Sequence, residues 1–186
     1  MAFPVLWVGP AGSGKLVAAR AALGVPADKA PRLQTLEIGD YSARYWEFPT
    51  HMEVDVMDLS MMDKQILPEL LTQLLSTRSV MGGGRKRMIL RRIHGLSPAA
   101  AVRLRACLEE LVWSPGAPAI IWATARTVNS IVAGVMDGFV YRRVPGPLPT
   151  DQLGRITLAK RVGVTTGTVT TIQTYLAEML RQMVDR

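Results

Sequence analysis

The stretch GPAGSGKL, residues 9–16, decides the predicted fold. It follows the apolar run FPVLWV (3–8), which is typical of a central strand, and it opens a segment of helical spacing that ends at Gly24. In that setting it matches the phosphate-loop pattern G-x-x-x-x-G-K, in which backbone N–H groups and a helix N-terminus face a phosphate. We therefore predict that ATP or ADP binds at residues Gly9, Pro10, Ala11, Gly12, Ser13, Gly14, Lys15 and Leu16.

Strands and helices alternate along the rest of the chain. Strands are predicted at 51–56, 87–90, 119–124 and 139–144, and helices begin at Asp63, as an N-cap, and at Ser97-Pro98. This alternation is typical of an α/β fold with a parallel sheet. The segment VPGPLP (144–149) has the composition of a linker, so we predict an α/β domain over 1–146 and a short helical segment over 147–186.

Composition narrows the classes of protein that fit. The 186 residues are 48% hydrophobic, enough for a core, and no apolar run approaches the roughly 18 residues of a membrane helix. The single cysteine, Cys107, excludes an internal disulfide and favours a reducing, intracellular compartment. The net charge of +7 favours a polyanionic partner, nucleic acid first.

Two positions depart from the pattern of an ATPase. A Ser or Thr hydroxyl normally follows the loop lysine and holds Mg²⁺, but this chain has Leu16. The strand 87–90 should end on an acid, but it ends on Arg91 and Arg92, and no acid follows before Glu109. We therefore expect nucleotide to bind without a protein-held Mg²⁺ and without hydrolysis, or not to bind at all. The arginine pair itself either contacts phosphates in place of the ion or forms a basic surface with another purpose.

The order of motifs resembles the AAA+ clamp-loader small subunits of the replication factor C type. The phosphate loop is the most specific match, and within 88–111 the residues Leu104, Arg105 and Glu109 match the helix that follows the family's Walker B strand. Further segments resemble the family's paired strands and acidic turn, its sensor strand and its passage into a helical lid; they are 38–75, 119–124 and 141–164. Together these segments cover nearly the whole chain.

The resemblance implies a P-loop AAA+ core sandwiched by helices, with part of a C-terminal lid. It also implies a hetero-oligomer with other clamp-loader-like AAA+ subunits, which loads a sliding clamp onto primed DNA in the nucleus or another site of replication. Thr124 stands at the family's sensor asparagine, and Asp137-Gly138-Phe139 stands at its Ser-Arg-Cys, so the arginine finger is absent. The chain is thus expected to be a pseudo-ATPase.

Other interpretations of the sequence remain open. Residues 158–172 also resemble a helix-turn-helix, which would make the chain a P-loop regulator that reads DNA. A small P-loop kinase would need acids for Mg²⁺, which are missing. His51 and His94 are expected to be ordinary surface or strand-end residues. Candidate contacts to phosphate or to the DNA backbone are Arg85, Lys86, Arg87, Arg91, Arg92 and Arg105, and Arg103 lies on the same helix as Arg105.

Overall fold

The computed structural model describes residues 3–23, 30–76 and 84–144. The chain divides into two units, Met1–Gly146 and Pro147–Arg186, and every described residue belongs to the first. The predicted lid over 147–186 and the alternative helix-turn-helix over 158–172 therefore lie outside the described residues. Among the described helices, none is long and apolar enough to cross a bilayer.

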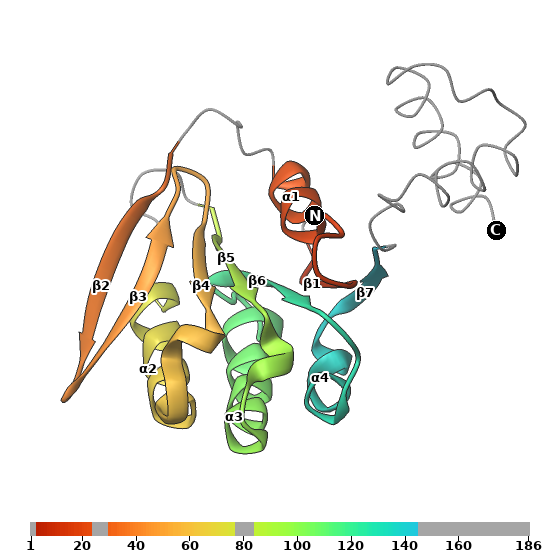
Figure 1. Ribbon diagram of the computed structural model, residues 1–186. Helices are drawn as coiled ribbons and strands as arrows, with labels where there is room; N and C mark the ends of the chain where they lie inside the picture. Colours follow the sequence, from red (N-terminus) through yellow and green to blue (C-terminus); the bar gives the residue numbers. More distant parts are fainter. Residues whose placement is uncertain (1–2, 24–29, 77–83, 145–186) are drawn as a thin grey trace, which may run out of the picture. The chain divides into compact units, whose positions relative to one another are not determined.

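A seven-stranded sheet forms the centre of the first unit (Figure 1), in the order β2-β3-β4-β5-β6-β1-β7. The strands are β1 (Val5–Val8), β2 (Arg32–Ile38), β3 (Tyr41–Glu47), β4 (Met52–Asp55), β5 (Lys86–Arg91), β6 (Ala119–Ala125) and β7 (Val140–Arg143). All neighbours from β4 to β7 pair in parallel, and only β2 with β3 and β3 with β4 are antiparallel. The predicted α/β class is confirmed, and the carboxyl ends of the parallel strands meet at one edge of the sheet.

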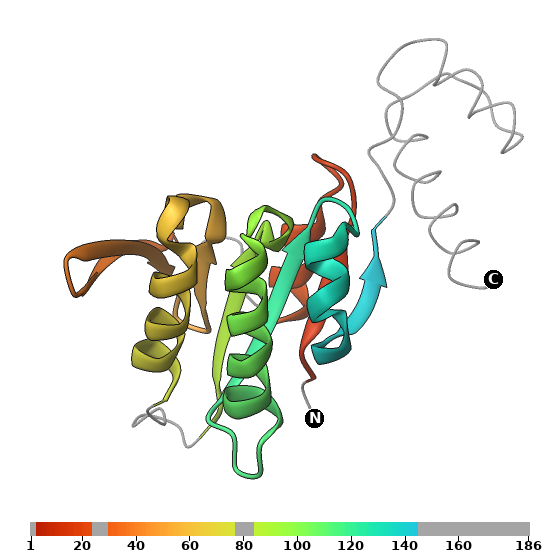
Figure 2. The same ribbon diagram turned by 90° about the horizontal axis from the view of Figure 1, so that it is seen from below.

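Helices cover both faces of this sheet. The described residues form four α-helices: α1 (Lys15–Ala22), α2 (Asp63–Leu75), α3 (Pro98–Leu108) and α4 (Ser130–Val135). Short turns connect them to the strands: η1 (Val56–Met62), η2 (Ile93–Gly95), the π-turn η3 (Glu109–Trp113) and η4 (Met136–Gly138). Helix α1 lies on one face, while α2, α3 and α4 lie side by side on the other, as Figure 2 shows from below.

The core follows from the two-residue period of the central strands. On β1, Leu6 faces the larger cluster under α2 and α3, and Trp7 faces a smaller cluster under α1. Central parallel strands are buried on both sides, so their sequences are apolar runs without alternation. The leucines Leu67, Leu70, Leu71, Leu104 and Leu108 fill the larger cluster and are fully or almost fully buried. Helix α3 has an apolar stripe, because its buried residues Ala101, Leu104 and Leu108 lie three or four positions apart.

Helix α4 is not among the predicted elements. It has six residues, and Asn129 caps it by accepting a hydrogen bond from the backbone N–H of Val132. Val132 and Val135 are its buried residues. A helix this short carries too few apolar positions for its period to stand out in the sequence.

Asp63 does not cap its own helix, so that prediction is wrong. It is the first residue of α2, and Met62 takes the N-cap position. The buried Asp63 carboxylate instead accepts hydrogen bonds from the backbone N–H of Ser97 at 2.6 Å and from the Ser97 hydroxyl at 2.8 Å. Ser97 is the N-cap of α3, as predicted, and its hydroxyl accepts from the backbone N–H of Ala100. Asp63 therefore joins the beginnings of α2 and α3.

We expect Asp63→Ala to destabilise the domain by about 2–3 kcal/mol, because Ser97 loses both hydrogen bonds to a buried charged partner. Urea unfolding followed by circular dichroism measures the change. Glu69→Ala is the matched control, since the Glu69 side chain is exposed on the same helix and accepts only from Gln73. Its cost should stay within about 0.5 kcal/mol. Equal costs for the two variants would contradict the joining role of Asp63.

Candidate phosphate-binding site

The phosphate loop connects β1 to α1 in the predicted way. Gly12 and Gly14 both have φ of +76°, a conformation that favours glycine, and Gly14 is the N-cap of α1. Gly9 has no room for a side chain, because an added Cβ would lie 2.5 Å from the carbonyl oxygen of Val144. The Gly9 backbone N–H donates to the carbonyl oxygen of Ala125 at 3.1 Å, so the loop starts against the end of β6. The glycine positions of the motif are therefore structural requirements of this turn.

Polar groups of the loop gather around Pro10. The Lys15 ammonium donates to the Pro10 carbonyl oxygen at 2.9 Å, and the Ser13 backbone N–H donates to the same oxygen at 3.3 Å. The Ser13 hydroxyl oxygen is buried and has no hydrogen-bond partner among the described residues. Burial, and then the charge of Arg126, lower the pKa of Lys15. The lysine thus sits close to a second cation.

Leu16 does not face the loop as a ligand. It packs against the apolar cluster under α1, which contains Trp7, Ala19 and Trp122. A hydroxyl at this position would bring a metal contact, whereas the leucine side chain contributes to packing. Leu16 therefore makes a packing contact at the position where an ATPase has a metal-binding hydroxyl.

The ends of β5 and β6 lie next to the loop. Strand β6 lies between β1 and β5, so β5 is the second neighbour of β1 and does not contact it directly. The Thr124 hydroxyl accepts from the backbone N–H of Arg92 at 3.2 Å, and His94 Nδ1 accepts from the backbone N–H of Arg126 at 3.2 Å. Burial lowers the pKa of His94, and the charges of Lys15, Arg126 and Arg92 lower it further. His94 therefore lies among three cations of this site and is half-buried beside them.

The arginine pair at the end of β5 is engaged by acids from β4. Arg92 Nε donates to both carboxylate oxygens of Asp55, at 2.6 and 2.8 Å, and its guanidinium also lies 3.6 Å from Asp58. Arg91 lies 3.5 Å from Asp55 and 4.0 Å from Glu53. Its guanidinium also stacks over the Trp46 ring, 4.9 Å from the ring centroid.

These contacts give the arginine pair a role that the sequence interpretation did not include. The sequence offered a contact to nucleotide phosphate or a basic surface. In the structure both guanidiniums pair with Asp55, and the Arg92 side chain is 48% exposed. Arg91 and Arg92 neutralise Asp55, which is only 2% exposed. The acids at this end of the sheet are thus Glu53 and Asp55 of β4, and both form ion pairs with arginines. The sequence contained a signal for these ion pairs. Glu53 and Asp55 lie two residues apart in a predicted strand, so they share one face of it and need partners if they are buried.

Glu53 is fully buried and anchors α1 to the sheet. Arg20, near the end of α1, donates to both Glu53 oxygens, at 2.6 and 2.7 Å. His51 Nε2 lies 3.0 Å from Glu53 and its ring stacks on Phe48, so His51 is a buried residue and not a surface one. Burial raises the pKa of Glu53, but the hydrogen bonds from Arg20 and His51 outweigh burial and leave the pKa below its ordinary value.

The described residues do not fit a bound Mg²⁺. They contain no group of three or more His, Cys, Asp or Glu side chains placed to hold a metal ion. Asp55 is the register partner of Arg91, where the acid was expected, and Arg92 contacts both of its oxygens. Leu16 offers no oxygen. A cation at this edge of the sheet would therefore have to displace an arginine first.

The other candidate basic residues lie away from the phosphate loop. Arg85 donates to the Val112 carbonyl at 2.5 Å, and Lys86 donates to the Leu74 carbonyl at 2.7 Å, both near the beginning of β5. Arg105 forms ion pairs with Glu109 and with Asp137, the residue before the position of the absent finger arginine. Arg87 and Arg103 are exposed. These side chains could still contact DNA, but the structure does not bring them together with the nucleotide loop.

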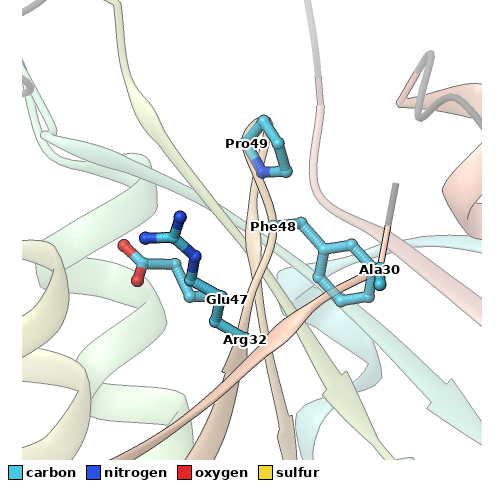
Figure 3. Close-up of a pocket in the computed structure, with 5 residues that line it drawn as sticks. All are labelled: Ala30, Arg32, Glu47, Phe48 and Pro49. Carbon is cyan, nitrogen blue, oxygen red and sulfur yellow. The ribbon is translucent and has the colours of Figure 1, made fainter. Parts of the chain in front are cut away.

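Two hollows of the surface lie along strands β2 to β5. A hollow of ≈470 Å³ is lined by Ala30, Arg32, Glu47, Phe48 and Pro49. Figure 3 shows the Arg32 and Glu47 side chains side by side, with Phe48 pointing to the other side. A second hollow of ≈340 Å³ contains His51 and the beginning of β5. Neither includes a residue of the phosphate loop.

Comparison with known proteins returned structural neighbours only. No protein-family model matches the sequence, and no curated protein matches it. The FIGL-1 AAA domain in complex with ADP has a TM-score of 0.48 and 13% identity over 90% of this chain and 51% of that chain. A DNA polymerase III gamma subunit-related protein from Thermotoga maritima has a TM-score of 0.43 and 13% identity over 85% of this chain and 45% of that chain. This chain thus spans about half the length of these neighbours, and the likeness does not extend to ligand, partner or activity.

We expect Glu53→Gln to destabilise the domain by about 3 kcal/mol, because it leaves the Arg20 and Arg91 charges without their buried partner. The folded-state pKa of Glu53 is depressed. Its contribution is therefore complete above the pKa of about 4.3 that Glu has in the unfolded chain, and is lost as pH falls through the folded-state pKa. Urea unfolding between pH 7 and pH 3 should show the gap between wild type and variant closing below about pH 4.

The exposed Glu37 supplies the control, because Glu37→Gln removes the same charge from β2. Its unfolding free energy should follow that of the wild type within about 0.5 kcal/mol at pH 7. The double variant Arg20→Met, Glu53→Gln should cost less than the sum of the single variants. Additive costs would show that the two side chains do not act as a pair.

Proposed function

We propose that this chain is a non-hydrolysing, clamp-loader-like P-loop subunit of a DNA replication complex, which helps to load a sliding clamp onto primed DNA. The observation that carries the first half of the proposal is the combination of a formed phosphate loop with an edge carboxylate, Asp55, that arginines already neutralise. Phosphoryl transfer requires Mg²⁺ to balance developing charge and a polar group to orient the attacking water. The proposal is supported by Leu16, which offers no oxygen, and by the pairing of Asp55 with arginine.

The resemblance to the replication factor C small subunits supports the second half. In such a ring, a silent subunit can present an interface to an active neighbour and basic side chains to DNA. Gly138 stands where the finger arginine is expected, so this subunit would not complete a neighbour's ATP site through that position. We propose partners of three kinds: larger clamp-loader-like AAA+ ATPase subunits, a sliding clamp, and DNA contacted through its phosphates. The setting would be intracellular, in the nucleus or another site of replication.

The Leu16 side chain and the occupied Asp55 lead us to expect no Mg²⁺-dependent ATP hydrolysis above background. Release of phosphate from purified protein, with and without Mg²⁺, measures this. Lys15→Ala is the control, because a contaminating ATPase would persist in that variant. Turnover by the wild type that disappears in Lys15→Ala would contradict the proposal.

We expect the native protein to be isolated together with larger AAA+ subunits, and the assembly to bind DNA without sequence preference. Its log affinity should fall linearly with log salt concentration, because phosphate contacts release counterions. Arg87→Gln should lower that slope by about one if Arg87 contacts a phosphate. Cross-linking of native extract, followed by filter binding at several salt concentrations, measures both expectations.

Another outcome of the same experiments would favour the alternative of a P-loop regulator that reads DNA through a helix-turn-helix. A purified chain that binds one defined DNA sequence as a dimer, and loses it when residues 158–172 are altered, would replace the clamp-loader proposal by the helix-turn-helix alternative.

A further inference from the structure

Arg126 is a cation beside the phosphate loop that the sequence motifs did not single out. It follows directly on the last residue of β6, Ala125, which pairs with Val8 and accepts the hydrogen bond from Gly9. Arg126 therefore leaves the sheet beside the first residue of the loop. Its backbone is fixed there, because its N–H donates to His94 Nδ1 at 3.2 Å.

No carboxylate neutralises Arg126 among the residues that the structure describes. The described ion pairs use Arg20, Arg91, Arg92 and Arg105, and Arg126 takes part in none. Its side chain is exposed, which leaves its guanidinium accessible to a ligand. Arg91 and Arg92 differ from it, since Asp55 already occupies both.

Arg126 also acts electrostatically on the loop. Its charge lowers the pKa of both Lys15 and His94, and its backbone N–H donates to His94 Nδ1 at 3.2 Å. Cations held close together disfavour one another, and an anion placed between them relieves that repulsion. The buried Ser13 hydroxyl has no partner among the described residues and adds a free polar atom to the same loop. The local charge is therefore arranged for a phosphate and not for a metal ion.

We propose that Arg126 takes the place of Mg²⁺ in this site, so that Arg126 and Lys15 together neutralise the polyphosphate of a nucleoside di- or triphosphate. The inference rests on the nucleotide site of the proposed function and adds the group that makes metal unnecessary. A guanidinium suits this role, because it carries a permanent charge and donates two parallel hydrogen bonds to phosphate oxygens. Binding of nucleotide is then independent of divalent cations.

Calorimetric titration of the full chain with ATP, ADP and inorganic phosphate tests the inference, in EDTA and in Mg²⁺. We expect the wild type to bind ATP and ADP equally well in both buffers. Arg126→Gln should weaken both by about tenfold or more, the loss typical of a charged hydrogen bond, and Arg126→Lys should restore part of it. Equal affinity for inorganic phosphate and ATP would overturn the nucleotide assignment.

Arg44→Gln is the matched control. It removes the same charge from an exposed position on β3, which lies four strands, or about 19 Å, from β1. Its affinity should match that of the wild type, and thermal unfolding without ligand should show that each variant is folded. Affinity that depends on Mg²⁺, or that is unchanged in Arg126→Gln, overturns the inference. If Lys15→Ala still weakens binding in that case, the phosphate site survives; if Lys15→Ala binds as the wild type does, the site itself fails.

Discussion

The buried carboxylates of β4 are the constraint on which the rest of this site depends. Glu53 and Asp55 point to the α1 side of the sheet, where the neighbouring strands present Ile89, Ile120 and Trp122. Removing a charge from water costs several kcal/mol per ion unless a partner compensates it. Arginines from other elements must therefore reach these two acids, and their positions follow from that requirement.

Two parts of the domain are fixed by this pairing. Arg20 ties the end of α1 to Glu53, and thereby holds the helix whose N-terminus forms the phosphate loop. Arg91 and Arg92 tie the end of β5 to Asp55. The same contacts that stabilise the sheet edge leave Asp55 without a free oxygen for a metal ion. One set of ion pairs thus stabilises the fold and places arginine on the carboxylate of Asp55.

The phosphate loop and the main elements were predictable from local sequence. The glycine spacing of 9–16 is required by the turn itself, and α3 carries its apolar stripe and its Ser97 cap within one short segment. The partners of Arg92 were not predictable in this way, because Asp55 lies 37 residues away and becomes adjacent only when β4 and β5 pair. Asp63 was misassigned for the same reason: its position suggests a local cap, but its partner Ser97 comes from another helix.

The central claim is that this phosphate loop binds a nucleotide through side-chain cations, while Asp55 stays in its ion pair with Arg92. A crystal structure of the chain grown with ATP and Mn²⁺, with anomalous data collected for manganese, tests it most directly. The account predicts phosphates contacted by Lys15 and Arg126, an intact Arg92–Asp55 pair, and no anomalous peak beside them. A manganese peak coordinated by Asp55, with Arg92 moved away, would contradict the account.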